Sequence, residues 1–297
     1  MTIVISNDYH ARTALEQARV QCKTKGEALK EDIRALRIGI LNIMPKAETY
    51  EFNLMHPLGR SIMQIEPVWI RLENHNYSSS NQTHIDNLYC TFEEAIYNQH
   101  LDGLILTGAP VENIPFEEIN YWSEIKRILK YATHNISSTL GICWGGLALA
   151  KTIGIPIEIY PKKLFGVFES VNLDRQHRIT GEIDDRFWCP QSRFAGITDN
   201  VIELEREKGN VNLLAYSEEI GYTIFETPDH RFLMHLGHPE YPSRRLVEES
   251  LRDRKLARPD VDPPKNFDVE LPVNRWRGHR TEFFSQWIKY LHESTSY

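Results

Sequence analysis

One cysteine stands in a setting that suits nucleophilic chemistry. Cys143 lies between the short β-branched run 136–140 and the apolar run 147–153, which favours a helix. We therefore expect Cys143 at a sharp turn from a strand into a helix, with the neighbouring glycines permitting the strain and the close packing. A helix N-terminus favours the thiolate, and the backbone N–H of Trp144 would face a developing oxyanion. This spacing suits covalent acyl chemistry.

A nucleophilic cysteine needs a general base, and the best candidate lies in the stretch 234–241, MHLGHPEY. His238 follows an apolar run, so the end of another strand would present it. Because one residue separates His238 from Glu240, the carboxylate can orient the imidazole and stabilise its protonated form. We predict a catalytic triad of Cys143, His238 and Glu240. The alternative is a structural cysteine, since most cysteines of cytosolic proteins are small buried hydrophobes.

The composition is that of a globular protein, with 297 residues of which 41% are hydrophobic and 25% charged. No apolar run approaches the roughly 18 residues of a membrane helix, and residues 1–8 lack the features of a signal peptide, so we expect a cytoplasmic protein with no membrane partner. The four cysteines show no CxxC spacing, which indicates neither a zinc site nor a disulfide framework. A formal net charge of −7 argues against a general nucleic-acid surface.

Strand and helix signals alternate along the first half of the chain, as in a parallel β-sheet. After an amphipathic N-terminal stretch, we predict strands over 37–44, 65–72, 101–106 and 136–140, and helices over 48–57, 92–97 and 116–131. The second half carries shorter strand signals at 165–168, 213–216, 222–225 and 232–236, then a charged helix over 244–255, a proline-rich linker and a terminal helix over 281–291. The charged helical positions are expected to face solvent. The pattern predicts a doubly wound, mostly parallel α/β sheet flanked by helices, with a C-terminal helical extension.

Several longer motifs make the chain recognisable. They are Asp32–Leu36 (DIRAL), Leu41–Pro45 (LNIMP), Thr107–Pro110 (TGAP), Tyr121–Trp122, Ile142–Gly145 (ICWG), Phe165–Glu169 (FGVFE), Leu236–Tyr241 (LGHPEY) and Arg275–His279 (RWRGH). With these motifs the chain resembles the homoserine O-acyltransferase family, the homoserine trans-succinylases and O-acetyltransferases. The resemblance implies a flavodoxin-like fold of the class I glutamine amidotransferase type and a single catalytic domain over residues 1–297.

The resemblance also implies a mechanism. An acyl group would pass from acyl-CoA to a thioester on Cys143 and then to a small hydroxy amino acid, with His238 as base and Glu240 as its orienting partner. Acyl-CoA would be a co-substrate, and no cofactor or metal is expected. A homodimer is compatible with the sequence. The second oxyanion donor would come from the loop around Met44–Pro45 or from Gly108–Ala109.

Three further positions match substrate contacts of the family, namely Lys163, Ser192 and Arg252. A guanidinium can hold the carboxylate of the acceptor with two hydrogen bonds, which lysine cannot. The alternative for Arg252 is a salt bridge on the helix surface with Glu248 or Glu249.

Glu112 occupies the family position associated with donor choice, where glutamate accompanies acetyl-CoA and glycine accompanies succinyl-CoA. A carboxylate there would repel and crowd the terminal carboxylate of a succinyl group. The alternative is a solvent-facing loop glutamate.

The chain departs from the family pattern at Gly146–Leu147, where alanine and glutamine are common, and at Gln191 and Phe194, where histidines are usual. These departures lie near the expected substrate contacts, so they leave the identity of the acceptor open. The sequence therefore favours an L-homoserine O-acetyltransferase of methionine biosynthesis. L-serine acetylation in cysteine biosynthesis and homoserine succinylation remain alternatives, because a one-methylene difference is discriminated by only about 1–3 kcal/mol. More distant alternatives are a glutamine amidotransferase-type hydrolase and a non-enzymatic relative.

Overall fold

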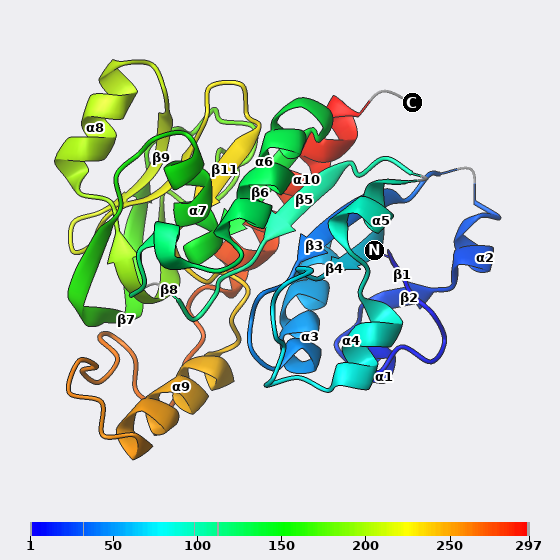
Figure 1. The fold of residues 1–297 in the computed structure, drawn as a ribbon, viewed down its shortest axis with the longest axis horizontal. Coiled ribbons are helices and arrows are strands. Elements are labelled where there is room, and N and C mark those ends of the chain that lie inside the picture. Colours follow the sequence, from blue (N-terminus) through cyan, green and yellow to red (C-terminus); the bar gives the residue numbers. More distant parts are fainter. Residues whose placement is uncertain (1, 32, 98, 112, 296–297) are drawn as a thin grey trace.

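The computed structural model describes residues 2–31, 33–97, 99–111 and 113–295 (Figure 1). Its strands form one 11-stranded sheet in the order β2-β1-β4-β3-β5-β6-β11-β10-β9-β7-β8. The first seven in this order are parallel: β2 (Gln21–Lys23), β1 (Thr2–Val4), β4 (Gln64–Ile70), β3 (Leu36–Leu41), β5 (Gly103–Leu106), β6 (Ser138–Ile142) and β11 (Phe232–His235). The other four continue the sheet antiparallel: β10 (Gly221–Glu226), β9 (Asn212–Ser217), β7 (Glu158–Asn172) and β8 (Arg186–Gly196).

Helices cover both faces of the sheet, as the alternation of strands and helices predicts. The described part of the chain contains α1 (Arg12–Gln17), α2 (Lys25–Ala28), α3 (Ala47–Leu58), α4 (Gln82–Leu88), α5 (Phe92–Tyr97), α6 (Trp122–Asn135), α7 (Trp144–Thr152), α8 (Asp199–Glu207), α9 (Ser243–Lys255) and α10 (Arg277–Ser294), with a short 3₁₀ turn at Phe116–Glu118. None of these described helices combines the length and apolarity that crossing a membrane requires.

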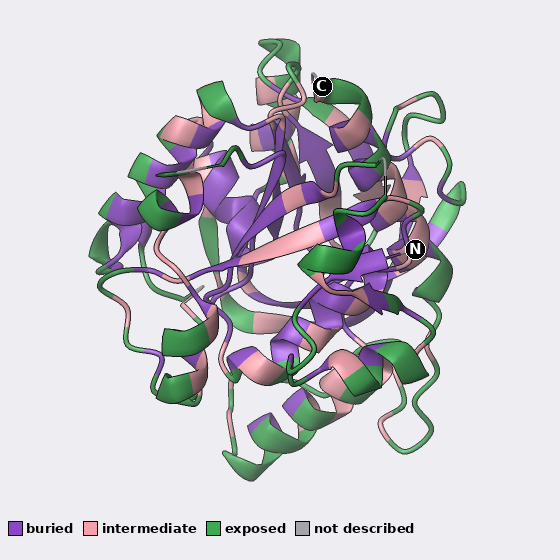
Figure 2. Ribbon diagram, turned by 90° about the vertical axis from the view of Figure 1, so that its right-hand side faces the viewer, coloured by how far each residue is buried: buried purple, intermediate pink, exposed green. Residues whose placement is uncertain are grey.

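Neighbouring residues of the central strands enter two separate cores. In β5, Ile105 packs into the core that also contains residues of α3 and α10, whereas Leu104 and Leu106 pack into the core shared with α6 and α7. Most residues of the strands between these layers are buried (purple in Figure 2), whereas the middle of β4 is half-buried. Because side chains alternate across a strand, both faces of the parallel region are apolar, as in a doubly wound fold.

Some predicted elements differ from the structure. The amphipathic N-terminal stretch, residues 11–36, contains α1, β2 and α2 among its described residues. The strand predicted over 165–168 is the middle of the 15-residue β7, and its partner β8 was not predicted. The first part of β7 is largely exposed and polar, so hydrophobicity reveals only its buried middle.

The predicted helices at 92–97 and 244–255 agree closely with α5 and α9, and the terminal helix is longer than predicted. α9 and the loop after it lie apart from the helices that cover the sheet, at the lower edge of Figure 1.

Candidate active site

The turn between β6 and α7 is the predicted nucleophile elbow. Cys143 follows the last residue of β6, is the N-cap of α7 and has the strained dihedral angles φ 53° and ψ −113°. Its N–H donates to the carbonyl oxygen of His235 at 2.8 Å, which ties the turn to β11. A Cβ atom on Gly145 would lie 2.1 Å from the carbonyl oxygen of Leu106, so α7 packs against β5 at a distance that only glycine allows.

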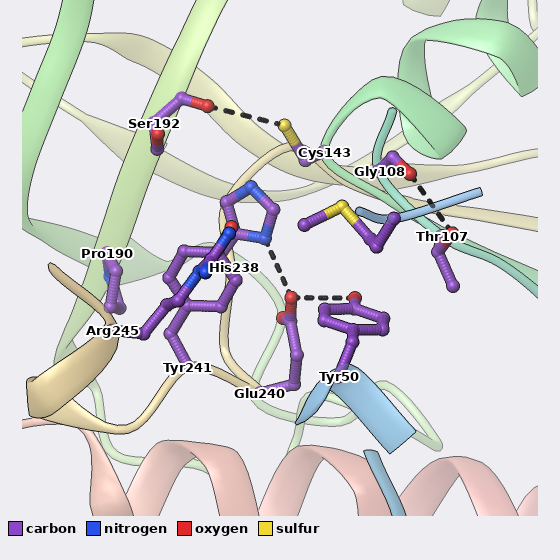
Figure 3. Close-up of polar contacts among 12 residues, drawn as sticks. Tyr50, Thr107, Gly108, Cys143, Pro190, Ser192, His238, Glu240, Tyr241 and Arg245 are labelled. Carbon is purple, nitrogen blue, oxygen red and sulfur yellow. Dashed lines mark hydrogen bonds and ion pairs between the residues drawn. The ribbon is translucent and has the colours of Figure 1, made fainter. Parts of the chain in front are cut away.

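The structure brings together the three residues of the predicted triad (Figure 3). His238 follows β11, and its Nδ1 lies 2.7 Å from Oε1 of Glu240. The same oxygen accepts a hydrogen bond from the hydroxyl of Tyr50, on α3, at 2.9 Å. Sγ of Cys143 lies 3.7 Å from the carbonyl oxygen of Ser192. All three triad side chains are buried.

Burial and nearby charges shift the pKa of His238 in opposite directions. Burial alone would lower the pKa of this imidazole, but its interactions with Cys143 and Glu240 outweigh burial and raise the pKa well above the usual range. The protonated imidazole is therefore favoured between the thiol and the carboxylate. A thiolate–imidazolium pair is the nucleophilic form that covalent acyl transfer needs.

A second buried carboxylate, Glu249 of α9, organises the other side of the site. Its Oε1 accepts from the hydroxyl of Tyr241 at 3.0 Å, and its Oε2 accepts from the hydroxyl of Ser192 at 2.6 Å. Nζ of Lys163 lies 3.5 Å from Oε2, and Nε of Arg245 lies 3.2 Å from Oε1. Burial alone would raise the pKa of Glu249, but Lys163, Arg245 and Ser192 lower it to about 2. Glu249 is therefore ionised at neutral pH.

These groups border a cavity of about 230 Å³ next to the elbow. Its lining residues are Met44, Pro45, Gly108, Ala109, Pro110, Asn113, Lys163, Ser192, Phe194, His238, Tyr241, Arg245, Glu249, Arg252, Asp253 and Arg258. The cavity therefore joins the proposed base to a set of fixed positive and negative charges.

The three predicted substrate contacts, Lys163, Ser192 and Arg252, all line this cavity. Lys163 is held 2.9 Å from Oδ2 of Asp253. Arg252 is half exposed and pairs with Oδ1 of Asp253 at 2.7 Å. Glu248 and Glu249, the carboxylates considered as alternative partners of Arg252, pair with other arginines. Arg244 pairs with Glu248, and Arg245 pairs with Glu249.

The other sequence-predicted positions divide into three groups. Glu112 lies outside the described residues. Gly146 and Leu147 are buried in α7, and Gln191 is buried against Arg193, with Nε of the arginine donating to its Oε1 at 3.0 Å. Of the four departures from the family pattern, Phe194 is the one that lines the cavity. The other three do not line the cavity, so an effect of theirs on the acceptor would act through neighbouring residues.

The two loops considered for the second oxyanion donor differ in whether they offer a free backbone N–H group. The N–H of Met44 donates to Oδ1 of Asn42 at 3.1 Å, and Pro45 has no N–H. A Cβ on Gly108 would lie 3.3 Å from Cε1 of His238 and 3.7 Å from Cβ of Cys143. The geometry thus favours the Gly108–Ala109 segment as the second donor. The first is the N–H of Trp144, which at the start of α7 has no acceptor within the helix.

Several residues of the site were not predicted as functional, namely Tyr50, Tyr241, Arg245, Glu249 and Asp253. The last three recur at four-residue intervals, which places them on one face of α9. That spacing was the available signal, but charged helical positions were expected to face solvent. The expectation is wrong for Glu249 and Asp253, which are buried.

Comparisons with known proteins agree with this architecture. The family model described as homoserine O-succinyltransferase matches residues 2–297. Homoserine O-acetyltransferases of Bacillus cereus and Bacillus anthracis are each 38% identical over 304 aligned residues, covering 100% of this chain and 99% of theirs.

Among solved structures, a glutamine amidotransferase of Methylobacillus flagellatus has a TM-score of 0.52 at 14% identity and covers 90% of this chain and 98% of its own. The glutaminase domain of Trypanosoma brucei CTPS, with bound acivicin, has a TM-score of 0.54 at 10% identity. The match covers 89% of this chain and 96% of that domain's chain. These likenesses show the class I glutamine amidotransferase-like fold. Because the family model and the relatives span almost the whole chain, this protein belongs to the homoserine O-succinyltransferase family of acyltransferases.

Proposed function

We propose that this protein is an L-homoserine O-acetyltransferase of methionine biosynthesis, working through a thioester on Cys143. The observation that carries the proposal is the position of the His238–Glu240 pair between the strained Cys143 and a cavity with charged groups of both signs. This arrangement joins a buried nucleophile and a buried base to a polar cavity.

In the first half-reaction, the Cys143 thiolate attacks the carbonyl carbon of acetyl-CoA. The resulting oxyanion is stabilised by the N–H of Trp144 and by the Gly108–Ala109 segment. As the C–S bond to CoA breaks, the imidazolium of His238 gives its proton to the leaving thiolate, and the acetyl group remains on Cys143.

In the second half-reaction, the hydroxyl of the amino acid attacks the thioester carbonyl while His238 accepts its proton. The C–S bond to Cys143 breaks, which releases the O-acetyl ester and restores the thiolate–imidazolium pair. Arg252 would bind the carboxylate of the acceptor, and the ionised Glu249 would bind its ammonium group. Tyr50 and Glu240 keep the imidazole in place through both steps.

The acetyl donor is supported by Glu112, whose negative charge would repel a succinyl carboxylate, and by the names of the Bacillus relatives. Homoserine as the acceptor is supported by the same names. Serine is the competing acceptor, because the cavity wall carries Phe194 where the family pattern has histidine.

The test is a comparison of kcat/KM for homoserine and serine, each with acetyl-CoA and with succinyl-CoA. We expect the highest value for homoserine with acetyl-CoA. Glu112→Gly should shift the donor ratio toward succinyl-CoA. A higher kcat/KM for serine would reverse the acceptor assignment, and an unchanged donor ratio in Glu112→Gly would remove the role of Glu112. Glutamine hydrolysis without acyl transfer would support the amidotransferase-type alternative.

A further inference from the structure

A third buried carboxylate, Glu51 of α3, lies in a cluster that acyl transfer does not use. Its side chain is 0% exposed. Oε2 accepts from the hydroxyl of Tyr9 at 2.7 Å, and Oε1 accepts from the hydroxyl of Tyr89 at 2.9 Å. In the described part of the chain, the basic groups within 4 Å of this carboxylate are two histidines, His10 and His84. A buried carboxylate without lysine or arginine needs another source of positive charge.

The two imidazoles approach Glu51 from different elements. Nε2 of His84, on α4, lies 2.7 Å from Oε1, and Nδ1 of His10 lies 3.6 Å from Oε2. The rings meet edge to face with their centroids 4.8 Å apart. One ligand atom from each of the three residues lies within 4.8 Å of the other two. The histidine side chains are 34% and 18% exposed, so solvent reaches the cluster.

The hydrogen bond on the far side of His10 determines which nitrogen can bind a cation. Nε2 of this ring lies 3.1 Å from the carbonyl oxygen of Glu48, which can only accept. In the neutral ring the proton is therefore on Nε2, and the lone pair of Nδ1 faces the Glu51 carboxylate. Two electron-rich groups face each other stably only if a cation or an additional proton lies between them. In metal-binding histidines, the ring nitrogen that does not bind the metal typically donates to a carbonyl oxygen in this way.

One histidine in each of two other clusters has the opposite arrangement. Nδ1 of His177 accepts the backbone N–H of Thr180 at 3.2 Å, and Nδ1 of His235 accepts the N–H of Gly237 at 3.1 Å. In both neutral rings Nε2 then carries the proton, and this is the nitrogen that faces the rest of the cluster. No backbone N–H of the described residues donates to a ring nitrogen of His10 or His84. Unlike His177 and His235, the neutral ring of His10 therefore presents a lone pair to its cluster.

We infer that His10, Glu51 and His84 form a binding site for a Zn²⁺-type divalent cation. Two imidazole nitrogens and one carboxylate oxygen suit Zn²⁺ better than Ca²⁺ or Mg²⁺, and water can complete a tetrahedral shell. Ligand atoms about 2.0–2.2 Å from such an ion are about 3.3–3.6 Å apart. One ligand atom from each residue already lies within 4.8 Å of the other two, so adjustments of up to about 1.5 Å bring the set to this range. The cysteine spacing considered above does not bear on this site, which contains no cysteine.

The test is Zn²⁺ titration by calorimetry, with all proteins carrying Cys143→Ala so that the thiol next to His238 and Glu240 cannot compete. We expect one site, and at least about a tenfold loss of affinity in His10→Gln and in His84→Gln. Zn²⁺ should raise the Tm of the parent protein but not that of either variant. The Co²⁺ derivative should show a d–d spectrum of nitrogen and oxygen ligands.

The matched control is His230→Gln, which alters the similar histidine pair around the buried Glu226. It should leave Zn²⁺ affinity unchanged. His10 lies at the surface, so its variant should fold even if His84→Gln does not. Absence of Zn²⁺ binding, equal affinity in His10→Gln and the parent, or an equal loss in His230→Gln would overturn the site.

Discussion

The ring of Tyr241 stacks on the imidazole of His238, with centroids 4.0 Å apart and planes inclined by 18°. The hydroxyl of Tyr241 donates to Glu249, so one side chain joins the base to the charged wall of the cavity. Tyr241→Phe keeps the stack but loses the hydrogen bond, whereas Tyr241→Ala loses both. We expect a severalfold loss of kcat/KM in the first variant and at least about a hundredfold loss in the second, because misplacement of the base is costly.

Tyr222→Phe is the control for Tyr241→Phe, since it removes a similar tyrosine–glutamate hydrogen bond, 2.9 Å long, outside the cavity. It should leave kcat/KM unchanged. If Tyr241→Ala retained full activity with an unaltered pH profile, Tyr241 would have no part in positioning His238.

Cys143 should carry the acyl group between the half-reactions. Intact-mass spectrometry after addition of acetyl-CoA should show an adduct of about 42 Da, which disappears when homoserine is added. Cys143→Ala should form no adduct, and His238→Ala should form it much more slowly. The effect of Glu240→Ala should be milder, because Glu240 only orients and stabilises the imidazolium.

Cys90→Ala is the control for this labelling, because Cys90 is a half-buried thiol outside the cavity. It should still acquire and lose the adduct. An adduct mapped to Cys22, Cys90 or Cys189 would contradict the mechanism, as would full activity of Cys143→Ala.

Arg252→Lys should raise the KM for the amino acid about tenfold or more, with a much smaller effect on the KM for acetyl-CoA. A lysine ammonium cannot reproduce the two-pronged contact of a guanidinium with a carboxylate. Arg244→Lys, on the exposed part of α9, should change neither constant. Equal changes in both constants of Arg252→Lys would indicate that the residue only pairs with Asp253.

Gly108→Ala should reduce kcat/KM about tenfold or more while the protein remains folded. The new Cβ would lie 3.2 Å from Sδ of Met44 and 3.3 Å from Cε1 of His238, so the base would have to move. Gly278→Ala on α10 meets nothing within 4 Å and should be neutral for activity. Wild-type kinetics in Gly108→Ala would show that this segment tolerates displacement and does not shape the oxyanion site.

The low pKa of Glu249 predicts how stability depends on pH. Since folding lowers this pKa from an ordinary 4.5 to about 2, the ionised carboxylate contributes stability above pH 4.5, and the contribution is lost as the pH falls toward 2. Glu249→Gln should therefore be less stable than wild type at pH 7, by on the order of 2–3 kcal/mol, with a smaller difference at low pH.

Urea unfolding at several pH values measures this difference. Glu182→Gln, at an exposed carboxylate, should show a small difference that does not change with pH. A difference for Glu249→Gln that stays constant down to pH 2 would mean that the carboxylate gains nothing from Lys163 and Arg245.

The sequence by itself determined the alternation of strands and helices, the elbow at Cys143 and the adjacent pair His238 and Glu240. These features are local, because a turn, a strand end and a separation of two residues are visible in a short segment. Tertiary structure decided the rest of the site. Tyr50 reaches Glu240 across 190 residues of sequence, and Ser192 reaches Glu249 across 57. Such contacts depend on strand order and helix packing, which local hydrophobic periodicity does not encode, so only the folded chain showed which charged residues of α9 are buried.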